Sequence, residues 1–230
     1  WNEYSSASQT VSELSAIGAP TRTLWVPLGI AWALLYGVFG WAVWNSAESN
    51  KPLRVTGASI LVAAVAGIFW PPMHLREVLA AGGGTLSDKL HIVWTVANAV
   101  FTLLAMGFAA AALGRRFRVY SIATMVILVA AGAVTSMYAS QLQANRPTPW
   151  MGVWERINIV AWLLWVAVLS VVLWRIAHER AHASDDRSRP SARGARAPRR
   201  IRHGLPATER LTKSATPALT AATRATPRKP

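Results

Sequence analysis

The sequence predicts an all-α fold, a polytopic transmembrane helix bundle. Its 230 residues are 53% hydrophobic and 15% charged, whereas about a quarter of the residues in an ordinary soluble domain are charged. The apolar residues are concentrated in five runs without a charged side chain. Each run is close to the ~20 residues that cross a bilayer as a helix. The runs are residues 23–47, 55–75, 92–114, 119–145 and 157–174.

The first 22 residues are polar and are expected to lie outside the membrane. Thr10-Val11-Ser12-Glu13 matches a capping box, in which a hydroxyl side chain and a carboxylate three residues later begin a helix. Gly18 and Pro20 then end this helix. Residues 1–22 are therefore predicted to form a polar segment with a short interfacial helix.

The first predicted transmembrane helix covers about residues 23–45. Trp25 and Trp44 lie near its two ends, where indole rings favour the level of the lipid headgroups. Pro27 falls in the first turn, where the missing N–H costs little. This run is thus bounded as a spanning helix should be.

The second and third predicted helices, about 54–72 and 88–113, flank a polar loop. The second helix ends at Pro71-Pro72 and contains small residues that let a neighbouring backbone approach, namely Ala63, Ala66 and Gly67. Ser87 is the predicted N-cap of the third helix. Asp88 then lies in its first turn, at the positive end of the helix dipole.

The fourth and fifth predicted helices cover about 119–141 and 155–176, which completes a transmembrane bundle within residues 23–180. Residues 181–230 carry twelve Lys or Arg against three Asp or Glu, and they lack hydrophobic periodicity. Such a composition is typical of a disordered segment. Most of the net charge of +14 therefore belongs to a basic tail.

The basic residues of the short loops predict the orientation. Lys51 and Arg54, then Arg115 to Arg118, and finally the tail fall on one side of the membrane, which the positive-inside rule identifies as the cytoplasm. We therefore expect a multi-pass protein of the cell membrane with a cytoplasmic tail. The lipid bilayer is the expected partner, with anionic lipid available to the tail. Nucleic acid is not expected, because the tail's arginines lack interleaved aromatic residues.

The opposite, outer side receives the charged residues of three separate segments. Helical spacing also places a polar stripe on the third helix, running from the outer end into the bundle. In lipid an amide needs a partner, so this stripe is expected to face other helices. The stripe comprises Asp88, His91, Thr95, Asn98 and Thr102, and the other outer residues are Glu13, His74, Arg76, Glu155 and Arg156.

Two functional hypotheses and one structural alternative follow. In the first, a non-enzymatic module binds a lipid headgroup, a small molecule or a partner through Glu13, Arg76, Asp88, Asn98, Glu155 and Arg156. In the second, a metal-assisted hydrolase acts on an amphiphile at the outer leaflet, with zinc held by His74, His91 and Asp88 and with Glu155 as a further ligand or general base. In the structural alternative, Asp88 caps its helix, His91 hydrogen-bonds Asp88, and Arg156 pairs with a carboxylate.

The first hypothesis is preferred, so no cofactor is predicted, and zinc belongs only to the alternative. An ion-coupled transporter is disfavoured because no Asp, Glu, Lys or Arg lies at mid-depth in a span. His178-Glu179-Arg180-Ala181-His182 matches the H-E-x-x-H pattern of metalloproteases, but it lies where the last helix leaves the membrane, without a second element to form a cleft. Gly82-Gly83-Gly84 follows no strand and is interpreted as a flexible turn, not as a phosphate loop.

Several short blocks resemble the prokaryotic membrane family called domain of unknown function 998, over about residues 3–175. The blocks are SQTVSEL (8–14), PMHLR (72–76), LSDKLH (86–91), LLAMGFAAAALGRRFRVYSI (103–122) and PTPWMGVWERIN (147–158). The resemblance implies a six-helix bundle in the intact protein, whose first helix this chain lacks. It also implies importance for Glu13, His74, Asp88, His91, Glu155 and Arg156, but it carries no established activity.

Overall fold

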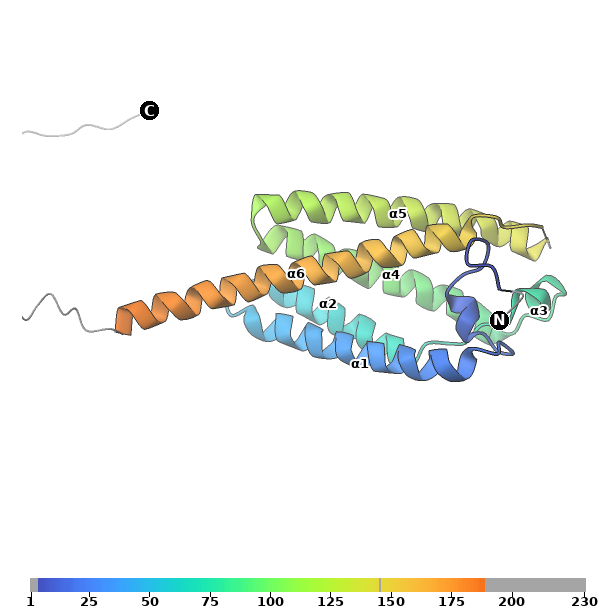
Figure 1. The fold of residues 1–230 in the computed structure, drawn as a ribbon, viewed down its shortest axis with the longest axis horizontal. Coiled ribbons are helices and arrows are strands. Elements are labelled where there is room, and N and C mark those ends of the chain that lie inside the picture. The colour runs from blue at the N-terminus through green and yellow to red at the C-terminus, as the bar shows by residue number, and fades with distance from the viewer. Residues whose placement is uncertain (1–3, 145, 189–230) are drawn as a thin grey trace, which may run out of the picture. The chain divides into compact units, whose positions relative to one another are not determined.

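Five long helices make up most of the part of the chain that the computed structural model describes, residues 4–144 and 146–188 (Figure 1). Each is long and apolar enough to cross a membrane. The described residues contain no strand, so the predicted all-α fold with five spans is confirmed. The long helices are α1 (Arg22–Ser46), α2 (Lys51–Ile68), α4 (Leu86–Ala112), α5 (Arg115–Gln143) and α6 (Met151–Ser188), and the short ones are a 3-10 turn (Ser12–Ser15) and α3 (Arg76–Ala80).

The helix α2 begins and ends earlier than hydropathy predicts. Its N-cap is Asn50, whose side-chain oxygen accepts a hydrogen bond from the Leu53 N–H, and Pro52 follows in the first turn. The helix ends at Ile68 with Phe69 as its C-cap, and Pro71 follows two residues later, where proline is common because it cannot continue a helix. Capping chemistry, not the end of the apolar run, therefore sets these bounds.

The helices α5 and α6 are longer than predicted. The basic run after Gly114 forms the first turn of α5, where Gly114 is the N-cap. At its other end, α6 continues past residue 180 to Ser188, through residues that the sequence assigned to the tail. This extension begins with Ala181, His182 and Ala183, and alanine continues a helix without hydrophobic burial because it has the highest helix propensity. The rest of the predicted disordered tail lies outside the described residues.

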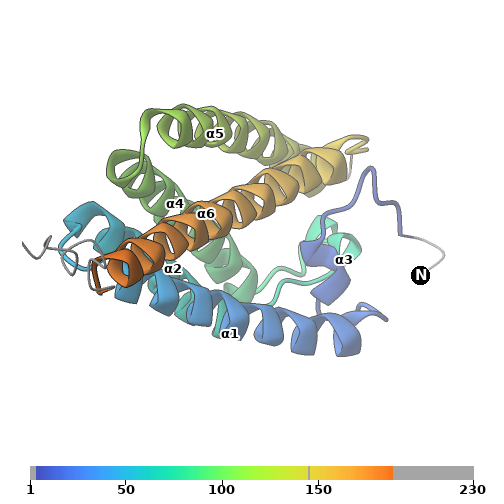
Figure 2. The same ribbon diagram turned by 60° about the vertical axis from the view of Figure 1, so that its left-hand side comes forward.

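The long helices pack as a series of neighbours. The largest interfaces join α1 to α2 and α2 to α4, followed by α5 to α6 and α4 to α5, while α6 touches α1 more lightly (Figure 2). A glycine lets the backbones of α1 and α2 approach closely, because a Cβ on Gly57 of α2 would lie only 2.6 Å from the backbone nitrogen of Trp44 in α1. Small residues of this kind replace the hydrophobic effect as the basis of helix association in lipid.

The core is formed mainly by α1, α2 and α4, and α5 and α6 complete it with Phe117, Trp165 and Leu169. Trp165 of α6 is fully buried, packs against Phe117 and donates from Nε1 to the Ser121 Oγ at 3.0 Å. Trp162, three residues before Trp165, meets the Tyr36 ring of α1 edge-on. These aromatic contacts attach α6 to the helices on either side of it.

Large apolar side chains cover the outside of the bundle. Leu35, Val38 and Val126 are each more than 60% exposed, and many other large apolar side chains of the five long helices are exposed as well. A surface that is apolar over the whole length of the helices is compatible with lipid and incompatible with water. With five candidate spans, the chain is a multi-pass membrane protein.

The connections at one end of the bundle form a structure that we call the cap, comprising residues 4–21, 69–85 and 146–150. It lies on the right of Figure 1, and the α1–α2 and α4–α5 connections lie at the opposite end. The backbones of two cap segments meet directly, since the Ile17 N–H donates to the Met73 carbonyl oxygen at 2.7 Å. The sequence predicted a short helix in the first segment, and the structure has a single 3-10 turn there.

Candidate functional site

The predicted polar residues gather at the cap, in three groups. The first contains Glu13 and Arg76, the second Glu155 and Arg156, and the third His74, Asp88 and His91. The structure thus brings together the three chain segments that the sequence predicted to converge. Within each group, however, the partners are specific, and several differ from the expected ones.

The first group is an ion pair within the cap, in which the Glu13 carboxylate is buried. Arg76 donates from Nε and Nη2 to the two carboxylate oxygens of Glu13 at 2.8 and 2.7 Å. Its remaining donors meet the Thr148 hydroxyl and the Ser8 carbonyl oxygen. The side chain of Glu13 is only 2% exposed. This two-point pairing joins all three cap segments through one guanidinium group.

The Glu13 carboxylate also accepts from the side chain of Gln9 and from the N–H and hydroxyl of Thr10. Burial by itself would raise the pKa of Glu13, but the hydrogen bonds and charge of Arg76, together with the Thr10 N–H, hold this pKa below its ordinary value. The carboxylate is therefore ionised at neutral pH. The predicted capping box is present in part, with Glu13 reaching back to Thr10.

The second group fastens the N-terminal segment to the first turns of α6. Glu155 accepts hydrogen bonds from the Val11 N–H and the Ser12 hydroxyl. Arg156 donates to the carbonyl oxygens of Ser6, Gln9 and Gly152 and to the Tyr4 hydroxyl. The predicted pairing of Arg156 with a carboxylate is not found among the described residues, because these carbonyl oxygens surround its guanidinium group instead.

The third group ties the 69–75 loop to the start of α4. Asp88 accepts from the backbone N–H and the Nδ1 of His74 at 2.7 and 2.9 Å, and from the N–H and hydroxyl of Thr85. Thr85 is the N-cap, and with Asp88 it completes a capping box. Two features of the sequence prediction were therefore wrong: the N-cap is not Ser87, and the histidine on Asp88 is not His91.

His91 is buried, and its Nδ1 lies 2.7 Å from the Pro71 carbonyl oxygen. The carbonyl accepts only, so Nδ1 carries the proton of this bond. Ser87 donates to the Pro72 carbonyl oxygen. The first turn of α4 thus satisfies the carbonyls of the Pro-Pro turn. This explains the concentration of polar residues in this stretch without reference to a ligand.

The predicted polar stripe of α4 is not a single buried face. Asn98 is half-buried, and the structure shows no hydrogen bond between it and another described residue. Thr95 is exposed and donates to the carbonyl oxygen of His91, within its own helix. Thr95 satisfies itself locally, as threonine does in helices, so it needs no partner helix.

The predicted metal ligands do not form a cluster. Among the described residues, no group of three His, Asp or Glu side chains is arranged to hold a metal ion. Both Asp88 oxygens accept hydrogen bonds, Oδ1 from the His74 N–H and Oδ2 from the N-cap residue Thr85. The His74–Asp88 pair does match the arrangement in which a carboxylate orients a metal-binding histidine.

A groove of about 520 Å³ runs along α5 and α6 from the edge of the cap. Arg156 lies in its wall, and so do Ser6 and Ala7 of the N-terminal segment. The rest of the lining is apolar and comes from α5 and α6: Ile127, Val153, Ile157, Val160, Ala161 and Leu164. The groove is open and shallow, with one cationic side chain at its mouth beside the N-terminal segment and apolar side chains along the two helices.

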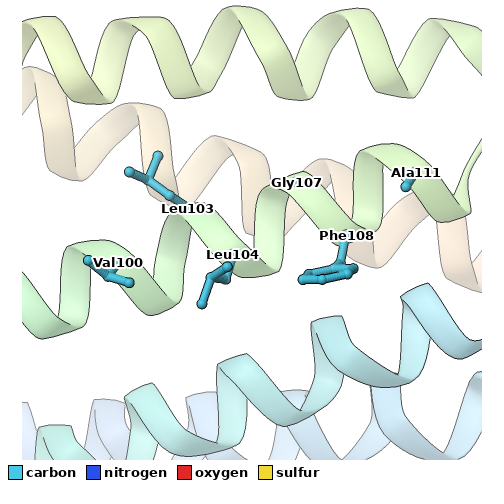
Figure 3. A pocket seen from close by; sticks show the side chains of 6 residues that line it. All are labelled: Val100, Leu103, Leu104, Gly107, Phe108 and Ala111. Carbon is cyan, nitrogen blue, oxygen red and sulfur yellow. The ribbon is translucent and has the colours of Figure 1, made fainter.

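A second hollow, of about 370 Å³, follows α4 (Figure 3). Val100, Leu104 and Phe108 project from one side of the helix, and Leu103, Gly107 and Ala111 complete the lining. All six are apolar and come from one helix, so this surface has the character of an ordinary lipid-facing side.

Several residues that organise the cap were not predicted from the sequence. Thr148 is buried, accepts from Arg76 and donates to the Ser8 carbonyl oxygen. Gln9 is also buried and contacts Glu13. Uncharged polar residues are common in loops, so composition does not distinguish Thr148 and Gln9 from ordinary loop residues. The position of Thr148 in a Pro- and Trp-rich block of the resemblance was the available signal.

Comparison with known families agrees with the resemblance noted in the sequence. A family model described as "Protein of unknown function (DUF998)" matches residues 1–172. No curated protein and no solved structure matches the chain significantly. The matched range contains every residue of the three polar groups and ends before the H-E-x-x-H pattern.

Proposed function

The chain belongs to the DUF998 family of proteins of unknown function, which assigns it no activity, and we propose from the groove beside Arg156 that it binds an anionic lipid at the outer face of the cell membrane. The headgroup lies beside Arg156, and one acyl chain follows the groove between α5 and α6. The observation that carries this proposal is the position of a guanidinium group at the mouth of an otherwise apolar groove.

The two cap arginines differ in how their charges are balanced. Arg76 is neutralised by the buried carboxylate of Glu13. Arg156 makes no ion pair with any described carboxylate: it donates to carbonyl oxygens and the Tyr4 hydroxyl, lies over the Tyr4 ring, and acts on the adjacent Glu155 only through its charge. A guanidinium group without a described ion-pair partner near the headgroup level attracts phosphate. Arg156, and not Arg76, is therefore the proposed contact.

The remaining predicted site residues support the mouth of the groove in this proposal. Glu13 with Arg76, and Glu155 with Val11, hold the N-terminal segment whose residues Ser6 and Ala7 line the groove. Asp88 and His74 order the neighbouring loop. Asn98 belongs to α4 and does not line the groove, so it receives no ligand role.

The lipid proposal is tested by filling the groove. Val160 and Val171 lie on the same helix and are 53% and 48% exposed, but only Val160 lines the groove. After delipidation, wild-type protein and the Val160→Trp and Val171→Trp variants are incubated with vesicles of phosphatidylglycerol and phosphatidylcholine. Co-purifying lipid is then quantified by mass spectrometry. Val160→Trp is expected to lose phosphatidylglycerol, and Val171→Trp to retain it.

The headgroup contact is tested by the ratio of the two lipids. Arg156→Gln removes the charge, and a charge-assisted hydrogen bond of about 1.5 kcal/mol corresponds to about a tenfold fall in preference for phosphatidylglycerol. Equal retention by both tryptophan variants contradicts the groove. An unchanged lipid ratio in Arg156→Gln contradicts the role of the arginine.

We do not extend the proposal to the metal-assisted hydrolase. That reaction needs a third ligand beside His74 and His91, and Asp88 is engaged as a helix cap. No observation in the described part of the chain favours hydrolysis over binding.

The proposed orientation places the cap outside the cell and the tail in the cytoplasm. The chain contains no cysteine, so a single introduced thiol reports on one position. Ser5 in the cap and Ser49 between α1 and α2 are both exposed. A membrane-impermeant maleimide is expected to label Ser5→Cys in intact cells and Ser49→Cys only after permeabilisation. The reverse pattern would invert the topology.

A further inference from the structure

The helix α6 projects past the other helices (Figure 1), and it carries two exposed histidines on either side of Arg180, which contacts Glu48 of the α1–α2 connection. His178 and His182 are one helical turn apart, so their side chains lie on the same face. Their Nε2 atoms are 3.0 Å apart. This pair lies beyond the range of the family match and has no part in the proposed lipid site.

The ring of His178 is held by a neighbour on the same helix. It stacks on the indole of Trp174, with ring centres 5.4 Å apart and planes inclined by 11°. The His182 ring stands nearly perpendicular to that of His178, at 89°. Stacking on a large aromatic ring limits the rotamers of His178, so less conformational entropy is lost when its nitrogen takes up a ligand.

Two arrangements bring neutral imidazole nitrogens this close. In one, a single N–H of one ring donates to the other ring. In the other, both lone pairs serve a common metal ion. With the usual metal–nitrogen distance of 2.0–2.1 Å, nitrogens 3.0 Å apart subtend an angle of about 95° at the ion. This angle lies between the ~90° of octahedral and the ~109° of tetrahedral coordination.

The local charges also permit a cation. Arg180 lies between the two histidines in sequence, but its guanidinium group pairs with the Glu48 carboxylate at 2.8 Å. That contact neutralises the charge of Arg180 and directs it toward the α1–α2 connection. On the face of the histidines, Arg175 lies three residues before His178 and Asp185 lies three residues after His182, and these two side chains carry opposite charges. Glu179 adds a negative charge next to His178 along the chain.

We propose that His178 and His182 form a two-histidine clip for a divalent transition metal ion such as zinc, with water completing the coordination. Imidazole suits zinc, copper and nickel and does not suit magnesium or calcium. The clip differs from the metalloprotease that the H-E-x-x-H pattern suggests. It needs neither a cleft nor a third protein ligand, and it joins successive turns of α6.

Zinc binding by the full chain in detergent tests the clip. The outer histidines are removed from the parent protein as His74→Gln/His91→Gln, and His203, outside the described residues, is kept in every variant. After chelation, zinc is added by equilibrium dialysis and measured by mass spectrometry. About one zinc per chain is expected, and His178→Gln/His182→Gln is expected to lose it.

The matched control keeps the number of histidines and moves one of them. His182→Gln/Ala183→His places the second imidazole five residues after His178, on a different face of the helix. Because chelation depends on both nitrogens reaching one ion, binding should weaken roughly tenfold or more. Equal affinity of this control and the parent protein would overturn the clip. So would equal zinc content in the parent and in His178→Gln/His182→Gln.

Discussion

Replacement of Glu13 by glutamine tests whether the buried ion pair holds the cap together. The change keeps the size of the side chain but removes the charge opposite Arg76. It also turns an N–H₂ group toward donors that now have no acceptor. Removing one partner of a buried ion pair costs about 3 kcal/mol or more, and the Glu13 side chain is 2% exposed. We expect Glu13→Gln to make cap opening about 100-fold more frequent.

Amide hydrogen exchange in lipid nanodiscs measures this opening. The reporters are the Gly152 and Val153 N–H groups, which both donate to the Ala7 carbonyl oxygen and do not touch Glu13. The exposed Glu48–Arg180 pair supplies the matched control, with side chains 69% and 58% exposed. An exposed pair is worth at most about 1 kcal/mol, so Glu48→Gln should leave exchange at the reporters unchanged.

Comparison of the double variant with the two single variants separates loss of the ion pair from general destabilisation of the cap. In Glu13→Gln/Arg76→Gln no buried charge is left unpaired, so the cap should open less often than the sum of the single changes predicts. If Glu13→Gln accelerated exchange no more than Glu48→Gln, the ion pair would not be the fastening of the cap. The same conclusion would follow if the effects of Glu13→Gln and Arg76→Gln on the free energy of cap opening were strictly additive.

Three further outcomes are expected. The pKa of Glu13 is held below its ordinary value, so its contribution to stability is complete above about pH 4.3 and is lost as pH falls through the lowered pKa; after the exchange rates are divided by the intrinsic amide rates at each pH, cap opening should rise below that pH in the wild type but not in Glu13→Gln, and equal pH profiles for the two proteins would contradict the assignment. Gly152→Ala places a methyl group against the carbonyl oxygen of Gln9, so it should lower the free energy of cap opening by about 1–3 kcal/mol, as measured by hydrogen exchange at the same reporters. Gly57→Ala should lower the thermal midpoint because its methyl group meets the backbone of α1, whereas Gly107→Ala, with open space around it, should leave the midpoint unchanged or raise it slightly; equal midpoints for the two variants would argue against the close α1–α2 approach.

Much of the architecture could be predicted from local patterns. Hydropathy and length identify the five spans, because each helix satisfies its own backbone hydrogen bonds and needs only an apolar surface to enter lipid. The basic loops and the polar loops fall at opposite ends of the bundle, as alternate connections of successive spans must. Helix ends were predicted less well, because α2 and α4 begin at caps that depend on particular side chains, Asn50 and Thr85.

The partners within the cap depended on the tertiary structure. The sequence placed Glu13, Arg76 and Asp88 at the same end of the bundle, but hydropathy and helical period carry no information about which groups meet. Arg76 finds Glu13 from 63 residues away, and Asp88 pairs with His74 in preference to His91, its neighbour on the same helix.

The physical reason is that a spanning helix is specified by its own residues, whereas a buried charge must be paired by whatever donor the folded chain brings within reach. Burial makes an unpaired carboxylate costly, so packing selects the arrangement in which every oxygen has a partner. The sequence by itself thus determined the spans and the end at which the polar residues gather. The packing of three distant segments decided that most of those residues hold the cap closed and that Arg156 lies at the mouth of a groove.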